Sequence, residues 1–519
     1  MKNNIISFLG NSKYLFFVLI TAFILSCSKN VNEPVASINT PSGLDENAGN
    51  WKPFVLASSE EIMVAEPKAA TSDEYKAEIS KLKETTAAIT PQQRELVNYW
   101  GAGAVFRWNE IGRELAARYN TPPASDKDGK YPLPDPANPL ADPKFPFANP
   151  PYTARALAYL SVAQYDALIS AWKYKFKFNR KAPAKTDESI KTLLPLTDLP
   201  SYPSEDAVVA EASFLVLKAM FPGEVPFLEE KLAQHKKSRL WAGMNVESDI
   251  AAGVELGKAV GAKVMARAKT DGMSTANNQS KTAEMIANAK SIGTTETWVS
   301  QEVPARPPML PTYGFVTPWN FDKAAVAEMR PSPPPAIGSA EYQQNIDELL
   351  QIAKKQTREQ ARIANFWSDG VGSYTPPGHW HRRAADLCHK NSYSEIRTAR
   401  TLALLGTTLQ DAGICCWDAK YYYYYPRPNQ MNKKIKTSVG LPNFPSYTSG
   451  HSTFSGAAAE LLSYIFPEEK EKLNQMAMEA SVSRIYGLIH YRFDCEAGLE
   501  AGHKIGQTAI HRAQLDGAL

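Results

Sequence analysis

Strand signals are the first thing that this sequence lacks. Alternating runs of Val, Ile and Thr are few across its 519 residues, and no Asn-Gly pair marks a two-residue hairpin turn. An excess of one charge is also missing, because 57 Lys and Arg face 54 Asp and Glu and leave a net charge of +3. Such a balance does not indicate a nucleic-acid partner. No P-loop or dinucleotide-binding glycine motif stands between an evident strand and helix.

The longest apolar run near the N-terminus, Tyr14 to Leu25, is too short to cross a bilayer, which takes ~20 residues. Lys2 and Lys13 precede it, which is typical of a signal peptide. The run ends in Leu25-Ser26-Cys27 and so resembles a bacterial lipobox, in which the cysteine is lipidated; an ordinary signal peptide with an incidental cysteine is the alternative. We expect residues 1–27 to be a lipoprotein signal peptide. The mature chain would then be exported and anchored by lipid on Cys27 to a bacterial membrane, at its periplasmic or cell-surface face.

Cysteine is scarce, and only four cysteines follow Cys27. An exported protein could oxidise them in any of three full pairings, or they could remain buried free thiols. The two neighbours in sequence are not expected to bond each other. These four residues are Cys388, Cys415, Cys416 and Cys495.

Helical patterning dominates the rest of the chain and predicts an all-α fold. Residues 28–72 are polar and are expected to form a flexible linker. A region of helices over 73–339 and a catalytic region over 340–519 should together form one compact unit, with two proline-rich stretches packed over the helices, and no internal repeat is visible. The helices are expected over 94–119, 152–173, 204–221, 225–241, 246–269, 340–368, 379–389, 394–418, 452–465, 468–490 and 497–514, with capping boxes at Thr90 and Thr357; the proline-rich stretches are 121–151 and 303–336.

Three short segments near the C-terminus carry most of the chemical information. Together they supply three cations, a hydroxyl and two imidazoles, which is what a pocket for a tetrahedral oxyanion such as phosphate or vanadate requires. The segments are Lys420-x6-Arg427-Pro428, Ser449-Gly450-His451 and Ser483-Arg484-x5-His490-x3-Asp494.

The spacing within these segments explains part of this chemistry. Ser449-Gly450-His451 precedes an apolar helical run, so free backbone N–H groups should favour an anion there, and Gly450 allows close approach. Asp494 follows His490 by four residues, so on one helix its carboxylate could hold one ring nitrogen and leave the other free. Arg484 and His490 would not share a helix face, and periodicity does not explain how they could meet.

These segments resemble the signature of the type 2 phosphatidic acid phosphatase superfamily, which includes vanadium-dependent haloperoxidases and bacterial acid phosphatases. All ten specified positions are present, and one departure is Thr448, where the family usually has proline. A likeness to the haloperoxidase branch extends to residues 361–370, 411–420, 154–158 and 165–167. The resemblance implies a helical bundle, in agreement with the all-α pattern.

The resemblance also implies roles for individual residues. In a haloperoxidase, vanadate would be bonded to His490 and held by Lys420, Arg427, Arg484, Ser449 and Gly450. In a phosphatase, His490 would attack phosphorus and His451 would protonate the leaving oxygen. Asp369 matches an aspartate that pairs with Arg484, and Trp417 and Phe444 match aromatic positions beside the haloperoxidase cofactor.

The aromatic matches and the chain length favour halide oxidation by hydrogen peroxide with vanadate as cofactor. Phosphomonoester hydrolysis through a phosphohistidine, without a cofactor, is the first alternative, and a non-catalytic oxyanion-binding lipoprotein is the second. The partners expected are small molecules, either peroxide and halide or a phosphoester. The sequence leaves the oligomeric state, the halide and the ester open. A metal site at His379 and His381 is disfavoured, because residues two apart do not share a helix face and no acidic partner follows; His235, His389, His503 and His511 are expected to be structural.

Overall fold

Helices form all the regular secondary structure in the computed structural model, which describes residues 36–131 and 146–518. No strand occurs within these two ranges, so the predicted all-α class is confirmed. The predicted signal peptide and its lipidation site at Cys27 lie outside the described residues. None of the described helices combines the length and hydrophobicity that crossing a membrane requires.

The first half of the chain places most helices where the sequence predicts them, and α8 spans the expected residues 225–241. The single helix expected over 94–119 is instead two, because the chain turns at Gly103, which has a φ of 121°. A capping box at Thr90 starts the first of these two helices. The elements are η1 (Glu46–Asn50), α2 (Asp73–Ala87), α3 (Pro91–Trp100), α4 (Ala104–Tyr119), α5 (Pro150–Phe178), α6 (Pro183–Thr186), α7 (Glu205–Met220), η2 (Pro222–Glu224), α8 (Val225–Trp241), α9 (Glu247–Ala268), η3 (Met273–Thr275), η4 (Gln279–Lys281), α10 (Thr282–Ser291), η5 (Tyr313–Phe315) and α11 (Ala325–Glu328).

In the second half, the helix expected over 340–368 is divided at Thr357, where a second capping box begins a new helix. The helix expected over 468–490 ends at Tyr486, which is important for the site described below. The elements are α12 (Ala340–Lys355), α13 (Arg358–Phe366), α14 (Thr375–Lys390), α15 (Glu395–Tyr423), α16 (Pro428–Met431), α17 (Gly450–Ile465), η6 (Pro467–Glu469), α18 (Lys470–Tyr486) and α19 (Arg492–Gln514).

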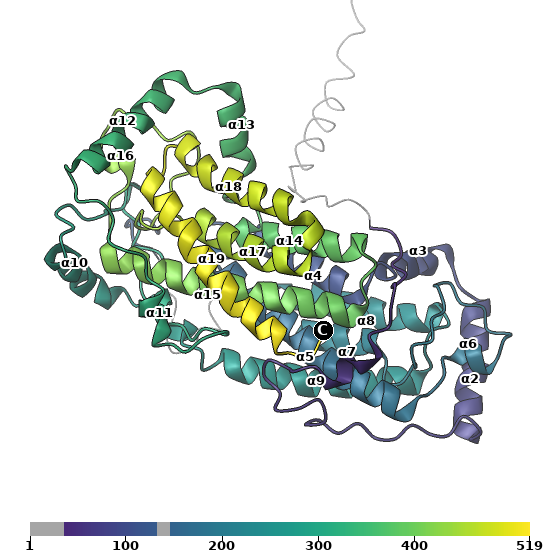
Figure 1. Ribbon diagram of the computed structural model, residues 1–519. Helices are drawn as coiled ribbons and strands as arrows, with labels where there is room; N and C mark the ends of the chain where they lie inside the picture. The colour runs from purple at the N-terminus through teal and green to yellow at the C-terminus, as the bar shows by residue number, and fades with distance from the viewer. Residues whose placement is uncertain (1–35, 132–145, 519) are drawn as a thin grey trace, which may run out of the picture. The chain divides into compact units, whose positions relative to one another are not determined.

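Four helices of the first half recur in the second half at a constant offset of 245 residues. For example, α5 begins at residue 150 and α15 at 395, and α8 begins at 225 and α18 at 470. We call α5, α7, α8 and α9 the first bundle, and α15, α17, α18 and α19 the second bundle; they are coloured blue to teal and green to yellow in Figure 1. The long helices α5 and α15 pack against each other. The expectation of no internal repeat is therefore wrong for the structure, although few side chains repeat.

Close helix packing inside each bundle depends on glycine. In the second bundle, a Cβ added at Gly502 of α19 would lie 2.5 Å from the carbonyl oxygen of Thr453 in α17. In the first bundle, a Cβ at Gly257 of α9 would lie 2.5 Å from the carbonyl oxygen of Val208 in α7. No side chain fits at these distances, so glycine brings the two backbones together.

Residues 28–72 were expected to form a flexible linker, but the described part of this segment is held against the helices. Trp51 and Leu56 are buried, and the carboxylate of Asp166 in α5 accepts the backbone N–H groups of Phe54, Val55 and Leu56 at 2.7–3.0 Å. Polar composition indicated a free segment, but a buried acceptor on a distant helix fixes it. The described residues from 36 onward belong to one compact unit.

The second proline-rich stretch packs over the helices through hydrogen bonds from tyrosines at the end of α15. The hydroxyl groups of Tyr421, Tyr423 and Tyr425 donate to the carbonyl oxygens of Met309, Pro331 and Pro335 at 2.6–2.8 Å. The tyrosine run therefore fixes a loop that would otherwise have few backbone partners.

Candidate oxyanion site

A cavity of about 180 Å³ lies at the N-terminal end of α17. Both proline-rich stretches contribute to its wall, through Phe147 and Pro150 from one and Arg306 and Met309 from the other. The predicted site residues that line the cavity are Asp369, Trp417, Phe444, Gly450, His451, Arg484 and His490. The structure therefore brings together side chains that lie more than 100 residues apart in the sequence.

His490 and Asp494 form a hydrogen-bonded pair at one side of this cavity. The Nδ1 of His490 lies 2.8 Å from Asp494 Oδ2, which also accepts the hydroxyl of Ser446 at 2.5 Å. Burial raises the pKa of Asp494 to about 6, so this carboxyl is ionised at neutral pH and Nδ1 must carry the hydrogen. Burial, followed by the charges of Arg427 and Lys420, holds the pKa of His490 well below its usual range. His490 is therefore neutral, with a lone pair on Nε2.

The pairing of these two residues was predicted for a reason that the structure does not support. They do not share a helix, because α18 ends at Tyr486 and α19 begins at Arg492. A turn with Leu488 at a φ of 59° folds the chain back after α18. This turn brings His490 toward Arg484, which helix periodicity could not explain.

Arg427 reaches the same place from the turn after α15. Its Nε donates to the carbonyl oxygen of Phe444 at 3.0 Å, and its Nη1 donates to that of Ile489 at 2.7 Å and lies 3.4 Å from His490 Nε2. Its buried Nη2 has no hydrogen-bond partner among the described residues. An unsatisfied buried donor beside an imidazole nitrogen that has only a long hydrogen bond is what a bound oxyanion would satisfy.

Arg484 lies in the last turn of α18 and also lines the cavity. Its Nε donates to Ser483 Oγ at 2.9 Å and its Nη2 to the carbonyl oxygen of Ala364 at 3.0 Å. Burial lowers the pKa of Arg484 to about 10, so the guanidinium stays charged. The predicted pairing with Asp369 is only electrostatic here: the carboxylate of Asp369 raises the pKa of Arg484 but has its hydrogen-bond contact with the ring of His379, 3.3 Å away.

Lys420 has a different environment from the one predicted. Its buried ammonium donates to the carbonyl oxygens of Pro445, Ser446 and Thr448, which uses all three of its N–H groups. Burial lowers the pKa of Lys420 to about 8. The lysine thus fixes the loop that leads into α17, and its direct contact with an oxyanion stays a prediction that would require one of these bonds to be exchanged.

The N-terminus of α17 supplies the remaining groups. Ser449 is the N-cap, and its Oγ accepts the N–H of Ser452 at 3.3 Å and also interacts with the thiol of Cys495. The space beside Gly450 is open, since an added Cβ would meet nothing closer than 3.9 Å. Burial and the charge of Arg484 hold the pKa of His451 well below its usual range, and its Nε2 has no partner among the described residues.

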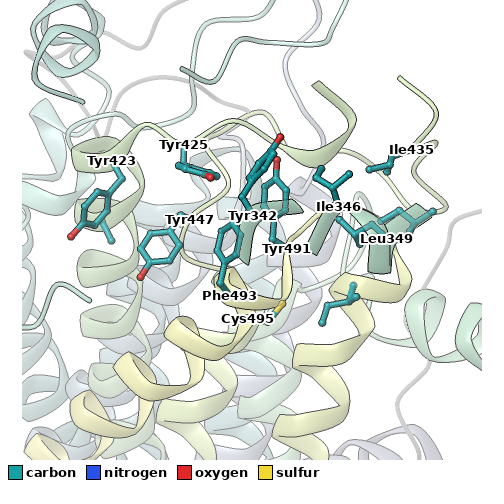
Figure 2. Close-up of a cluster of buried hydrophobic side chains, with 13 residues drawn as sticks. Tyr342, Ile346, Leu349, Tyr423, Tyr425, Ile435, Tyr447, Tyr491, Phe493 and Cys495 are labelled. Atoms are coloured by element: carbon teal, nitrogen blue, oxygen red, sulfur yellow. The ribbon is translucent and has the colours of Figure 1, made fainter. Parts of the chain in front are cut away.

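Aromatic side chains surround these polar groups. The rings of Trp417 and Phe444 lie 5.0 Å apart, and the Lys420 ammonium lies 4.9 Å from the Phe444 ring. A separate cluster of buried side chains supports the loops on which the site depends. Figure 2 shows that it gathers residues from α12, α15, the loop before α17 and the start of α19: Tyr342, Ile346, Leu349, Tyr423, Tyr425, Ile435, Tyr447, Tyr491, Phe493 and Cys495.

Sequence reasoning missed two residues near the site. Ser446 donates to Asp494, but a serine in an irregular loop carries no periodic signal. His379 stacks on Trp367 at 4.5 Å between ring centroids and binds Asp369. His381, its partner in the disfavoured metal site, does not line the cavity and is fully buried, with a pKa that burial lowers to about 3. No cluster of three or more metal-binding side chains occurs in the described part of the chain.

The cysteines show no disulfide in the described residues. Cys388, Cys415, Cys416 and Cys495 are all free and buried. The sequence left both disulfide bonds and buried free thiols open, and the structure has free thiols.

Comparison with known proteins agrees with this geometry. Residues 401–514, which contain all three segments of the site, match the sequence model of the PAP2 superfamily. No curated protein matches the chain in sequence. The fold is similar to that of a bacterial vanadium-dependent iodoperoxidase, with a TM-score of 0.57 and 22% identity over 78% of this chain and 96% of that one. It is also similar to a holo-type bacterial vanadium-dependent chloroperoxidase, with a TM-score of 0.50 and 12% identity over 76% of this chain and 99% of that one.

Proposed function

We propose that this chain, whose residues 401–514 match the sequence model of the PAP2 superfamily, is a vanadium-dependent haloperoxidase that oxidises halide with hydrogen peroxide. The observation that carries the proposal is the neutral His490, which lines the cavity and lies beside Arg427, whose Nη2 is unsatisfied among the described residues. We further propose that the enzyme is exported and lipid-anchored through Cys27.

The described residues fit vanadate in charge and in donor chemistry. Vanadate needs one nitrogen ligand and several hydrogen-bond donors. Arg427 Nη2 has no partner among the described residues, and His490 Nε2 has only the long 3.4 Å contact with Arg427 Nη1. Arg484 adds a second fixed cation, and the N-terminus of α17 at Gly450 adds backbone N–H groups and the positive end of a helix dipole. Bound vanadate would supply an electrophilic centre that activates hydrogen peroxide toward halide.

The chain's own residues have separable tasks in this reaction. Asp494 keeps the hydrogen of His490 on Nδ1, so that Nε2 remains the ligand atom. Arg427 and Arg484 neutralise negative charge on the bound oxyanion. His451, neutral and with a free Nε2, can take a proton from incoming peroxide. Trp417 and Phe444 form an apolar part of the cavity wall.

Phosphomonoester hydrolysis is the second candidate, and the same geometry of His490 favours it. A neutral imidazole held by a carboxylate is also a suitable nucleophile toward phosphorus, and His451 could protonate the leaving oxygen. The similarity of the fold to an iodoperoxidase over 96% of that chain and the aromatic pair beside the cavity support our choice of halide oxidation as the first candidate. A non-catalytic oxyanion-binding lipoprotein ranks third, because binding alone needs neither histidine.

Parallel assays of the same preparation decide between the two reactions. Under the proposal, protein loaded with vanadate oxidises halide in the presence of peroxide, and added phosphate inhibits it. Efficient ester cleavage without any halide oxidation, together with phosphohistidine trapped on His490 by rapid quench, would instead establish a phosphatase. A protein that binds vanadate but performs neither reaction would be the binding lipoprotein.

The pocket assignment has its own test. Arg427→Ala and Arg484→Ala should each weaken vanadate and phosphate binding roughly tenfold or more, because a hydrogen bond to a charged group contributes ~1.5–3 kcal/mol. Isothermal titration measures both affinities. Arg492→Ala is a suitable control, because Arg492 pairs with Glu348 at the surface. Unchanged affinities in both site variants would place the oxyanion elsewhere.

A further inference from the structure

The first bundle repeats the site segments of the second bundle in register. At the offset of 245 residues that relates the helices, six of the ten signature positions carry the same residue. The repeated residues are Lys175, Pro183, Ser204, Ser238, Arg239 and Asp249, which correspond to Lys420, Pro428, Ser449, Ser483, Arg484 and Asp494.

The repeated side chains also make the same contacts. In both bundles the lysine donates to the carbonyl oxygen of a proline, the arginine Nε donates to the preceding serine, and the N-cap serine N–H donates to the backbone of the aspartate. These pairs are Lys175–Pro200 at 2.6 Å and Lys420–Pro445 at 3.0 Å, Arg239–Ser238 at 3.2 Å and Arg484–Ser483 at 2.9 Å, and Ser204–Asp249 and Ser449–Asp494, both at 2.9 Å. The first bundle therefore has the framework of the oxyanion site and not only its helices.

Four signature positions differ, and each was predicted to touch the oxyanion in the second bundle. Ala182 stands in place of Arg427, so the first bundle has two of the three cations. Glu205 replaces Gly450, and Asp206 replaces His451, at the N-terminus of α7. Glu205 Oε2 lies 2.6 Å from Lys175 Nζ, and Asp206 Oδ2 lies 3.4 Å from Arg239 Nη1. Both acids thus neutralise the cations that correspond to Lys420 and Arg484.

The environment of Asp206 keeps this carboxylate ionised. Burial alone would raise its pKa, but Arg239 and a hydrogen bond from His235 lower it to about 2. His235 Nδ1 accepts the indole N–H of Trp108 at 3.0 Å, so its Nε2 carries the hydrogen that Asp206 accepts at 3.0 Å. The structural role expected for His235 is therefore to fix Asp206.

One donor of this framework still has no partner. Arg239 is 5% exposed, and its Nη2 has no hydrogen-bond partner among the described residues, whereas Nη2 of its counterpart Arg484 donates to the carbonyl oxygen of Ala364. Asn245 stands at the position of His490, and its Nδ2 donates to the carbonyl oxygen of Ser201 at 3.1 Å. An amide is neither the ligand nor the nucleophile that an imidazole is, so this place could bind an anion but not perform the chemistry.

We propose that the first bundle contains a second oxyanion site, which the carboxylates of Glu205 and Asp206 occupy in place of an external anion. The wild-type chain then binds one tetrahedral oxyanion, in the second bundle. Removing both carboxylates while keeping Lys175 and Arg239 opens the first bundle to phosphate or vanadate. The inference rests on the proposed oxyanion binding of the second bundle for its template, but its test does not need that site.

The test uses inorganic phosphate and isothermal titration in an Arg427→Ala/Arg484→Ala background, in which the second bundle no longer binds. Adding Glu205→Gly and Asp206→Asn should create binding of one phosphate per chain, and adding Arg239→Ala should remove it again. Asp198→Asn, which changes an exposed acid, is the matched control and should create no binding. A folded carboxylate-free variant that binds no phosphate would overturn the proposal.

A reciprocal pair of variants in the second bundle tests the proposal if the carboxylate-free variant of the first bundle does not fold. In the otherwise wild-type chain, Gly450→Glu/His451→Asp should weaken phosphate binding at least a hundredfold, because the introduced carboxylates would occupy the second site. Gly450→Gln/His451→Asn has the same side-chain sizes without the charges and should retain more affinity. Equal affinities in these two variants would contradict the proposal. If the wild-type chain itself binds neither phosphate nor vanadate, the proposed function fails, and the carboxylate-free variant still reports on the first bundle.

Discussion

The sequence predicted which residues belong to the site, because the residue type determines what chemistry a side chain can perform. It did not predict the direction in which each side chain points. The residue types and their order identified His490, Arg484 and His451, all of which line one cavity. The direction of Lys420 was not predictable, because its ammonium can reach either an anion or three carbonyl oxygens, and only the folded loop before α17 decides. Ser446 was missed for the same reason.

His451 is the residue at which binding and catalysis should separate. We expect His451→Ala to keep most of the oxyanion affinity, because Arg427, Arg484 and the N-terminus of α17 remain, and to lower turnover ~10²–10⁴-fold through loss of an acid–base group. Vanadate titration and steady-state kinetics of one preparation measure both quantities.

His490→Ala is the comparison for this variant. It removes the only nitrogen that can bond to vanadium or phosphorus, and should abolish turnover in either reaction. Full turnover by His490→Ala, or a loss of affinity in His451→Ala as large as in Arg427→Ala, would reverse these assignments.

At the scale of helices, local signals predicted most boundaries. The capping boxes at Thr90 and Thr357 start helices as expected, because a side-chain acceptor and a side-chain donor satisfy the free ends there. The break at Gly103 was missed because its cause lies elsewhere: Glu395 of α15 accepts the N–H groups of Ala104 and Val105 at 2.9 Å and so caps α4 from another helix. A cap that comes from another helix leaves no pattern in the sequence around the start of the capped helix.

Glu395 should make stability depend on pH in a defined direction. Burial, together with the charge of Asp206, raises its pKa to about 7 in the folded chain, against ~4.3 in an unfolded one. The folded state therefore binds an extra proton between these values, and the contribution to stability is present below pH ~4 and is lost as pH rises through 7.

The measurement compares the wild type with Glu395→Gln, which does not titrate. Between pH 5 and 7 the free energy of unfolding of the wild type, relative to this variant, should fall by about 2–3 kcal/mol. Denaturant unfolding at several pH values gives the difference. Glu500→Gln changes an exposed glutamate and serves as the control. A difference that stays constant with pH would mean that Glu395 is already ionised at pH 5.

The glycines between α17 and α19 should connect packing to binding. A Cβ at Gly498 would lie 2.8 Å from the carbonyl oxygen of Ser449, and its counterpart at Gly253 would lie 2.5 Å from that of Ser204. Both Gly498→Ala and Gly253→Ala should lower the free energy of unfolding by ~1–3 kcal/mol, as overpacking does. Only Gly498→Ala moves the N-terminus that receives the oxyanion, so it alone should weaken phosphate binding.

Chemical unfolding and phosphate titration of the two glycine variants test this expectation. Because the positions are equivalent, each variant controls for the general cost of a methyl group between helices. Equal loss of affinity in both would indicate that stability, and not the position of α17, governs binding.

For the whole molecule, the repeat of two bundles is the feature that the sequence concealed. The helix boundaries repeat at an offset of 245 residues, but the side chains that repeat are mainly those that hold the backbone, such as Ser204 and Ser449 or Gly257 and Gly502. Most core positions accept any apolar side chain of suitable size, so their residues need not repeat between the halves. The few residues that do repeat are spread over about a hundred positions, and the repeat is therefore not visible in the sequence. The two halves thus share their architecture, whereas the residues that we propose to carry the chemistry occur only in the second half.

The location of the whole molecule should depend on one residue outside the described range. If Cys27 is lipidated, mass spectrometry of the mature N-terminus should find a diacylated cysteine, and the protein should sediment with membranes. Cys27→Ala should release the protein from the membrane fraction without changing its oxyanion affinity, since the cavity is formed by residues beyond 119. One acyl chain gives only reversible attachment and two give stable anchoring, so washing with salt should not remove the wild type. An unmodified Cys27, or a mature chain that begins at another residue, would show an ordinary signal peptide in place of a lipid anchor.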